Sequence, residues 1–295
     1  MRGIQMSNKS DFIMLPTNDF CFKELMQNPK VRKGFIAGIL RKDPKEIKET
    51  ILLPTETRRD YIDDKLSILD VKVMLIDGTQ LDMEMQVEYV ASWDKRTLFY
   101  LAKMYTGQMQ RGDGYDKLKK CIHVGVLNFM YFPNSEACYH KINLCNSRTG
   151  EVYSDLFELH VLELPKLPKV LRKMEQGEEV SDEPIIRWME FFSGKTQEDF
   201  ESMAKQDEYM EEAVNTLFEL SADEKKRLEY EAREKAIRDH NWKMYSARQS
   251  GLEEGIAQGI ELATKIYKAK SSGKTVDEIA EEYGLSVEQV KKIVE

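Results

Sequence analysis

A strictly alternating segment, residues 80–89, is the feature that most constrains the fold of this chain. Apolar side chains stand at 81, 83, 85, 87 and 89, and Gln, Asp or Glu fills each position between them. A period of two predicts a β-strand with one buried and one polar face. Residues 66–76 also have strand character, and the intervening Asp77-Gly78 is a strong hairpin signal.

The length of the turn decides which residues face each other in this hairpin. A two-residue loop would place Asp70 opposite Met85 and mix the polar and apolar faces, whereas a three-residue loop at 76–78 keeps the faces consistent. Gly78 then takes the left-handed position of a type I turn with a bulge. The pairs expected in this register are Asp70 with Glu84, Lys72 with Asp82, and Ile68 with Gln86.

The opposed carboxylates of Asp70 and Glu84 indicate a cation site. Directly opposed residues have Cβ atoms roughly 4.5–5.5 Å apart, and like charges there are destabilising. A divalent cation would remove that cost, and Mg²⁺ prefers one or two carboxylates plus waters and phosphate oxygens. The hairpin therefore predicts a metal site for phosphate chemistry. From the residues alone, a solvated acidic face that aids solubility is the alternative.

Short motifs throughout the chain follow the order and spacing of a known family. They are residues 19–23 (Asp-Phe-Cys-Phe-Lys), 69–71, 76–78, 84–86 (Glu-Met-Gln), 95–96 with Tyr100, Gln108 with Tyr115, 163–166 (Glu-Leu-Pro-Lys), and Trp188 with 191–192. Together they resemble the PD-(D/E)xK nuclease superfamily, in particular its branch of nuclease family transposases and recombination-promoting nucleases. Leu69 and Gln86 depart from the superfamily's name pattern, which has proline and lysine there. This branch often carries Glu-x-Gln, so the second departure is mild. It still leaves open which lysine, if any, serves the reaction.

The resemblance implies an activity and roles for individual residues. It implies a Mg²⁺-dependent DNA endonuclease, with Mn²⁺ as a second ion, associated with recombination or a mobile element. Asp70, Glu84 and the backbone carbonyl of Met85 would hold the metal. Gln86 would orient the attacking water and Lys23 would stabilise the phosphate, so the expected catalytic residues are Lys23, Asp70, Glu84 and Gln86; Lys72 is a weaker candidate for the lysine.

Three further residues are candidate DNA contacts by the same resemblance. Gln108 and Tyr115 match a motif that contacts DNA or the edge of the active site in related nucleases, and packing at a helix end is their alternative. Arg96 would contact a phosphate or pair with a nearby carboxylate. The net charge of −8 disfavours general nucleic-acid binding, because DNA affinity depends on Lys and Arg. Any DNA contact must therefore use local basic patches.

The order of expected elements favours an α/β fold. A helix from residue 19 to the Asp43-Pro44 break, the hairpin, a helix at 93–110, an apolar strand at 121–129 and two further strands suit a restriction-endonuclease-like mixed sheet flanked by helices. We expect residues 1–168 to form the nuclease domain. A charged helical region at 169–270, for packing or self-association, and a helix-turn-helix-like pair at 271–295 would follow.

Composition limits the remaining classes of function. No apolar run reaches the roughly 18 residues of a membrane span, and no secretory signal is evident, so we expect a cytoplasmic protein. The four cysteines and four histidines lack the spacing of a zinc site. DNA is the expected partner, and a homo-oligomer through the charged helices is a further expectation. A catalytically inactive DNA- or partner-binding protein on the nuclease fold, or a helical assembly protein, are the competing readings.

Overall fold

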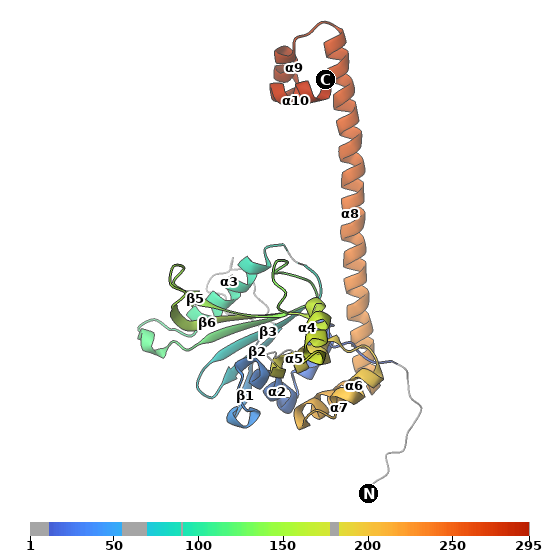
Figure 1. Ribbon diagram of the computed structural model, residues 1–295. Coiled ribbons are helices and arrows are strands. Elements are labelled where there is room, and N and C mark those ends of the chain that lie inside the picture. Colours follow the sequence, from blue (N-terminus) through green and yellow to red (C-terminus); the bar gives the residue numbers. More distant parts are fainter. Residues whose placement is uncertain (1–11, 55–69, 90, 178–182, 295) are drawn as a thin grey trace. The chain divides into compact units, whose positions relative to one another are not determined.

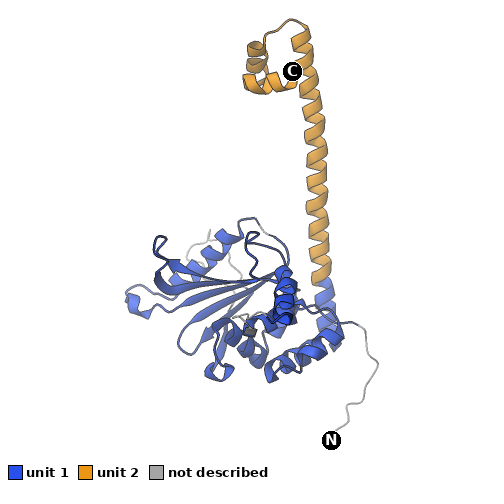
Figure 2. Cartoon of the chain, in the orientation of Figure 1, with its two compact units in different colours: residues 1–232 blue, residues 233–295 orange. Residues whose placement is uncertain are grey.

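The chain forms two compact units that divide between Ala232 and Arg233 (Figure 2). A computed structural model describes residues 12–54, 70–89, 91–177 and 183–294. Within this part of the chain no helix is long and apolar enough to cross a membrane.

The first unit is built on a six-stranded mixed sheet with the order β1-β2-β3-β4-β6-β5 (Figure 1). The strands are β1 (Thr50–Leu53), β2 (Val71–Leu75), β3 (Gln80–Gln86), β4 (Cys121–Leu127), β5 (Tyr139–Cys145) and β6 (Val152–Glu163). The central strands β3, β4 and β6 run parallel, and the outer pairs are antiparallel. The predicted mixed sheet flanked by helices is confirmed.

The β2–β3 hairpin has the predicted register. Lys72 pairs with Asp82, and the Val71–Met83 pair places Asp70, which directly precedes β2, at the same end of the hairpin as Glu84. Gly78 has φ +86° and donates its amide hydrogen to the Leu75 carbonyl at 2.9 Å, as expected for a three-residue loop. The predicted partner of Gln86, at position 68, lies outside the described residues.

One face of the sheet packs against helices from both ends of the first unit. These are α1 (Asp19–Leu25), α2 (Pro29–Leu40), α5 (Glu183–Ser193) and α7 (Glu208–Ala222), and the shorter α4 (Leu167–Glu175) and α6 (Gln197–Met203) complete this layer. Met83 and Met85 of β3 share one core with Phe22, Phe35 and Phe192. The first predicted helix is divided in two, because Asn28 caps a new helix that begins with Pro29.

The opposite face of the sheet is covered by α3 (Trp93–Thr106) (Figure 1). Trp93 packs with Leu127, and a Cβ atom added to Gly125 would lie 2.6 Å from Cζ2 of the Trp93 ring. The helix therefore approaches β4 closely because position 125 has no side chain. Under this helix Asp82 and Glu84 are each only 1% exposed, so the alternative of a solvated acidic face is wrong.

Helices α5, α6 and α7, which follow residue 168, belong to the first unit. We expected the nuclease domain to end there, but Trp188, Phe191 and Leu217 lie in the same core as the strands. Their apolar positions are interspersed with charged residues that cover the outer faces of the helices. The chain consequently divides near residue 232, well beyond the expected boundary.

The second unit contains most of the 48-residue helix α8 (Glu224–Ser271), followed by α9 (Val276–Tyr283) and α10 (Val287–Val294). The expected pair of short helices is present. Thr275 and Glu278 form a capping box, and Gly284 ends α9 with φ +65°. Ile279 and Val290 pack with Ile266 of α8 in a small separate core.

Candidate active site

The candidate active site lies where β3 ends and β2 begins. The register of the hairpin sets Asp70 beside the position of Glu84. Lys23 of α1 reaches the same point, with its Nζ 2.9 Å from Oδ1 of Asp70 and 3.9 Å from Oδ2 of Asp19. Three of the predicted catalytic residues, Lys23, Asp70 and Glu84, are thus brought together by elements far apart in the sequence.

Burial makes the Asp70 carboxylate costly to ionise. Its pKa is raised above the usual range because desolvation, with smaller contributions from Asp82 and Asp19, outweighs the attraction of Lys23. The ion pair with Lys23 therefore only partly compensates the partly buried negative charge of Asp70.

Glu84 is the more strongly perturbed acid. Burial raises its pKa to about 7, Asp82 and Asp70 add to the rise, and the charges of His123 and Arg96 oppose it. Its Oε1 lies 3.3 Å from Nη2 of Arg96, which comes from α3. Its Oε2 is buried and has no hydrogen-bond partner in the described structure.

A buried Asp82–His123 pair lies beside Glu84 and was not predicted. His123 Nδ1 is 2.9 Å from Oδ2 of Asp82, and both side chains are almost fully buried. Burial alone would lower the pKa of His123, but Asp82 and Glu84 raise it above its usual value. The pair forms because residues 82 and 123 are partners in the parallel β3–β4 ladder. The local sequence holds no signal for that pairing.

The buried oxygens at this site suit a divalent cation. Glu84 Oε2 and Asp82 Oδ1 are both buried without a hydrogen-bond partner in the described structure, which is costly unless something neutralises them. The described residues contain no group of three or more His, Cys, Asp and Glu side chains arranged to hold a metal. Asp70 and Glu84 would therefore supply two ligands, and the Met85 carbonyl, waters and phosphate oxygens the others.

Of the other predicted residues, some lie on the strands and helix at the acid pair and some lie at the far end of the strands. Arg96 lies at the site and pairs with the Glu84 carboxylate, which is one of its two expected roles. Gln86, at the end of β3, donates a hydrogen bond from Nε2 to the Glu88 carbonyl at 3.2 Å. The partly buried Lys72 has its pKa lowered by burial.

Gln108 and Tyr115 lie at the other end of the strands. Gln108 donates to the Lys119 carbonyl at 3.0 Å and accepts from the Lys119 amide at 2.8 Å, so it fixes the backbone just before β4. The start of β4 pairs with the start of β3, about 13 Å along the strand from Glu84. Tyr115 lies in the intervening loop and is 82% exposed. The fold therefore does not bring either residue to the acid pair.

The Glu-Leu-Pro-Lys motif forms a buried network of hydrogen bonds at the end of β6. The Lys166 ammonium is 2.6 Å from Oε2 of Glu163 and donates to the Phe132 carbonyl at 2.6 Å. Glu163 also accepts a hydrogen bond from the Phe132 amide at 3.0 Å and contacts His140 at 3.0 Å. This network connects the loop after β4 to the end of β6 and has a structural role.

A pocket of about 570 Å³ opens beside this end of the sheet. Thr17, Asn128, Leu164, Ser193 and Lys195 contribute to its lining. The Asn128 amide donates to the Gln86 carbonyl at 3.0 Å, so the pocket begins next to the end of β3.

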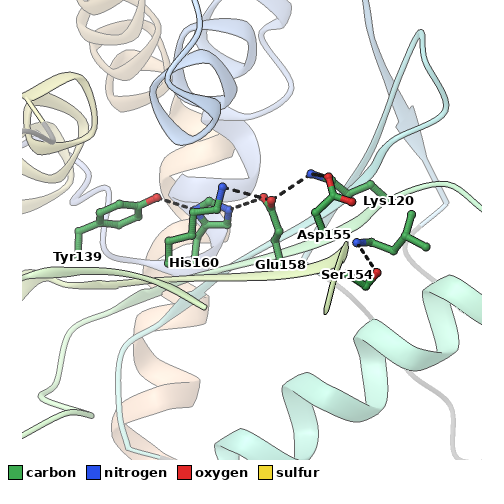
Figure 3. A network of polar contacts seen from close by, with 8 residues as sticks. Lys120, Tyr139, Ser154, Asp155, Glu158 and His160 are labelled. Carbon is green, nitrogen blue, oxygen red and sulfur yellow. Dashed lines mark hydrogen bonds and ion pairs between the residues drawn. The ribbon is translucent and has the colours of Figure 1, made fainter. Parts of the chain in front are cut away.

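A second polar network lies on the opposite face of the sheet (Figure 3). Tyr139 Oη contacts His160 Nδ1 at 2.7 Å, and His160 Nε2 lies 3.3 Å from Oε2 of Glu158. Lys120 and Lys141 pair with the other Glu158 oxygen at 3.0 and 3.2 Å. Burial opposes ionisation of Glu158, but these partners hold its pKa well below the usual range. The network joins β4, β5 and β6, and every Glu158 oxygen is satisfied.

Comparison with known proteins places these features in a family. A family model described as PD-(D/E)XK nuclease family transposase matches residues 16–247, which include the whole sheet, the acid pair and the helices on both faces. Searches of curated proteins and of solved structures found no match. Because the match covers well over half of the sequence, the chain belongs to the PD-(D/E)XK nuclease family transposases.

Proposed function

We propose that this protein is a divalent-metal-dependent DNA endonuclease that hydrolyses phosphodiester bonds in recombination or in the movement of a mobile element. The observation that carries the proposal is the acid pair formed by the partly buried Asp70 and the buried Glu84, with one Glu84 oxygen left without a partner in the described structure. Family membership supports a nuclease-like role in mobile elements.

The residues around the acid pair suit this chemistry. Asp70, Glu84 and the Met85 carbonyl would hold Mg²⁺ or Mn²⁺, which when bound supplies positive charge at the phosphate and lowers the pKa of a bound water. Lys23 and Arg96 each end beside one of the two carboxylates. Their charges are therefore positioned to stabilise the additional negative charge of a phosphate in the transition state.

Gln86 has a more limited role in this proposal. An amide can donate and accept hydrogen bonds but cannot take a proton at neutral pH, so Gln86 would orient a water without acting as the base. The pocket next to Gln86 offers both apolar and polar walls for a nucleotide on one side of the cleaved bond. Arg96 is the predicted DNA contact that lies at the site.

A second candidate function is a binding protein on the nuclease fold that does not cut DNA. Two observations favour it. Gln86 occupies the position where the superfamily's name pattern has lysine, and Lys23 is already engaged with Asp70. Under this alternative the same surface binds DNA or a protein partner without hydrolysis.

Nicking of supercoiled plasmid in the presence of Mg²⁺ or Mn²⁺ tests the proposal. The wild type is compared with Asp70→Ala and Glu84→Ala, and Glu136→Ala serves as a control because this exposed carboxylate lies on the loop after β4. We expect the first two variants to lose metal-dependent cutting and the control to retain it. Circular dichroism establishes that all variants are folded.

The other outcomes separate the alternatives. Cutting that survives in both acid variants would show that the activity has another origin. A wild type that binds DNA but cuts neither supercoiled, linear nor single-stranded DNA with either ion would favour the binding protein.

A further inference from the structure

The middle of α8 carries a row of exposed apolar side chains. Trp242, Tyr245, Leu252, Ile256 and Ile260 are between 54% and 68% exposed. Their spacing of three, seven, four and four residues places them on one face of the helix. Trp242 and Tyr245 stack on each other with ring centroids 6.0 Å apart. We call this row the α8 stripe.

A line of glycines runs directly beside the α8 stripe. Gly251, Gly255 and Gly259 are spaced four residues apart, and a Cβ atom added to any of them would meet no described atom within 4 Å apart from the neighbouring residues and the adjacent backbone of the helix itself. A glycine in a helix interior costs about 1 kcal/mol relative to alanine. No contact within the described chain requires these glycines, so the reason for them must be sought in a partner that approaches the helix closely.

The charges along α8 identify the partner as a second copy of the same helix. Residues 233–248 contain five basic and two acidic side chains, a net charge of +3 with His neutral. Residues 249–262 contain three acidic side chains and no Lys or Arg, a net charge of −3. Two parallel copies would align like charges, whereas two antiparallel copies place each basic segment against an acidic one.

We propose that α8 pairs antiparallel with α8 of a second copy of this chain through the α8 stripe, making the protein a homodimer. With the boundary between residues 248 and 249 at the centre of the pair, Tyr245 faces Leu252 of the second copy. Met244, which is 61% exposed, faces the stretch between Gly251 and Gly255, where the missing Cβ atoms leave room for it. The paired segment, about 30 residues, is about 45 Å long. This pairing is independent of the chemistry proposed for the first unit.

Light scattering coupled to size-exclusion chromatography of the full chain tests the pairing. The wild type should have twice the monomer mass of 34.4 kDa. Leu252→Glu with Ile256→Glu should weaken dimerisation by at least roughly a hundredfold, because it would bury four charges in the dimer. The matched control, Ser250→Glu with Ala257→Glu, adds the same charge on the other face of the same exposed segment and should remain dimeric.

Disulfide cross-linking tests the orientation in a Cys145→Ser background, which removes the one exposed cysteine. Chains with Arg238→Cys mixed with chains with Ile260→Cys should form a mixed cross-link, and Ile260→Cys alone should form none. A wild type that is monomeric at high micromolar concentration would overturn the proposal. The α8 stripe would then bind a different molecule. The proposal would also be overturned by a dimer that survives Leu252→Glu with Ile256→Glu, or by self-linking of Ile260→Cys, which indicates a parallel pair.

Discussion

Replacement of Glu84 by glutamine should stabilise the metal-free protein at alkaline pH. The pKa of Glu84 is raised from 4.5 to about 7, mainly by burial and then by Asp82 and Asp70. The folded protein therefore binds this proton more tightly than the unfolded chain does. The contribution of Glu84 to the free energy of unfolding is most favourable below pH 4.5 and is lost as the pH rises through 7.

The size of the effect follows from the same values. A rise from 4.5 to about 7 corresponds to roughly 3 kcal/mol once the group is fully ionised. Glutamine has nearly the same shape and carries no charge. We therefore expect Glu84→Gln to exceed the wild type in free energy of unfolding by up to roughly 3 kcal/mol near pH 8, with the difference vanishing near pH 4.5. Loss of the Arg96 contact reduces the gain.

Urea unfolding in the presence of a chelator at several pH values measures this difference. Glu158→Gln is the matched control, because Glu158 is also a buried glutamate of the same sheet but has its pKa lowered by its partners. Its replacement should destabilise the protein at neutral pH, and that loss should persist down to pH values near 5. Added Mg²⁺ should stabilise the wild type and leave Glu84→Gln unchanged. A Glu84→Gln protein no more stable than the wild type near pH 8 would refute the reasoning.

Three further predictions concern the frame around the site and the second unit. Lys166→Met should lower the free energy of unfolding by roughly 3–5 kcal/mol, because it leaves the buried Glu163 carboxylate without its cation; an unchanged urea midpoint would contradict this. Gln108→Ala should speed proteolysis within residues 109–118 and leave Mg²⁺ binding unchanged, and loss of Mg²⁺ binding would instead connect Gln108 to the acid pair. Gly284→Ala should lower the stability of the α9–α10 pair by roughly 1–2 kcal/mol, because residue 284 has φ +65° and alanine is strained there. Amide hydrogen exchange should then be faster in α9 and α10 only.

Local sequence rules account for the hairpin and the short terminal helices. Alternation along β3 and the glycine at 78 fix which residues face each other, since a slip by one residue would reverse both faces. The capping box at Thr275 and the glycine at 284 likewise define the start and the end of α9. These signals lie within a few residues of the structure that they specify.

The parts that sequence analysis missed depend on contacts between distant segments. The Asp82–His123 pair needs the parallel alignment of β3 with β4, which lie some 40 residues apart, and neither residue has a distinctive neighbour. Helices α5, α6 and α7 carry so many surface charges that the sequence pattern does not mark their buried positions, such as Trp188, as core. Gln108 fitted a DNA-contact motif, yet its side chain is used to hold the Lys119 backbone.

Gly125 has no chemistry of its own, yet it sets the height of the helix above the acid pair. A methyl group there would press against the Trp93 ring and lift the start of α3. Arg96 lies about one turn further along that helix, so its distance to Glu84 depends on how deeply the ring is seated. The electrostatic environment of the candidate metal site can therefore be adjusted by one substitution beneath a tryptophan, with every acidic and basic residue of the site left in place.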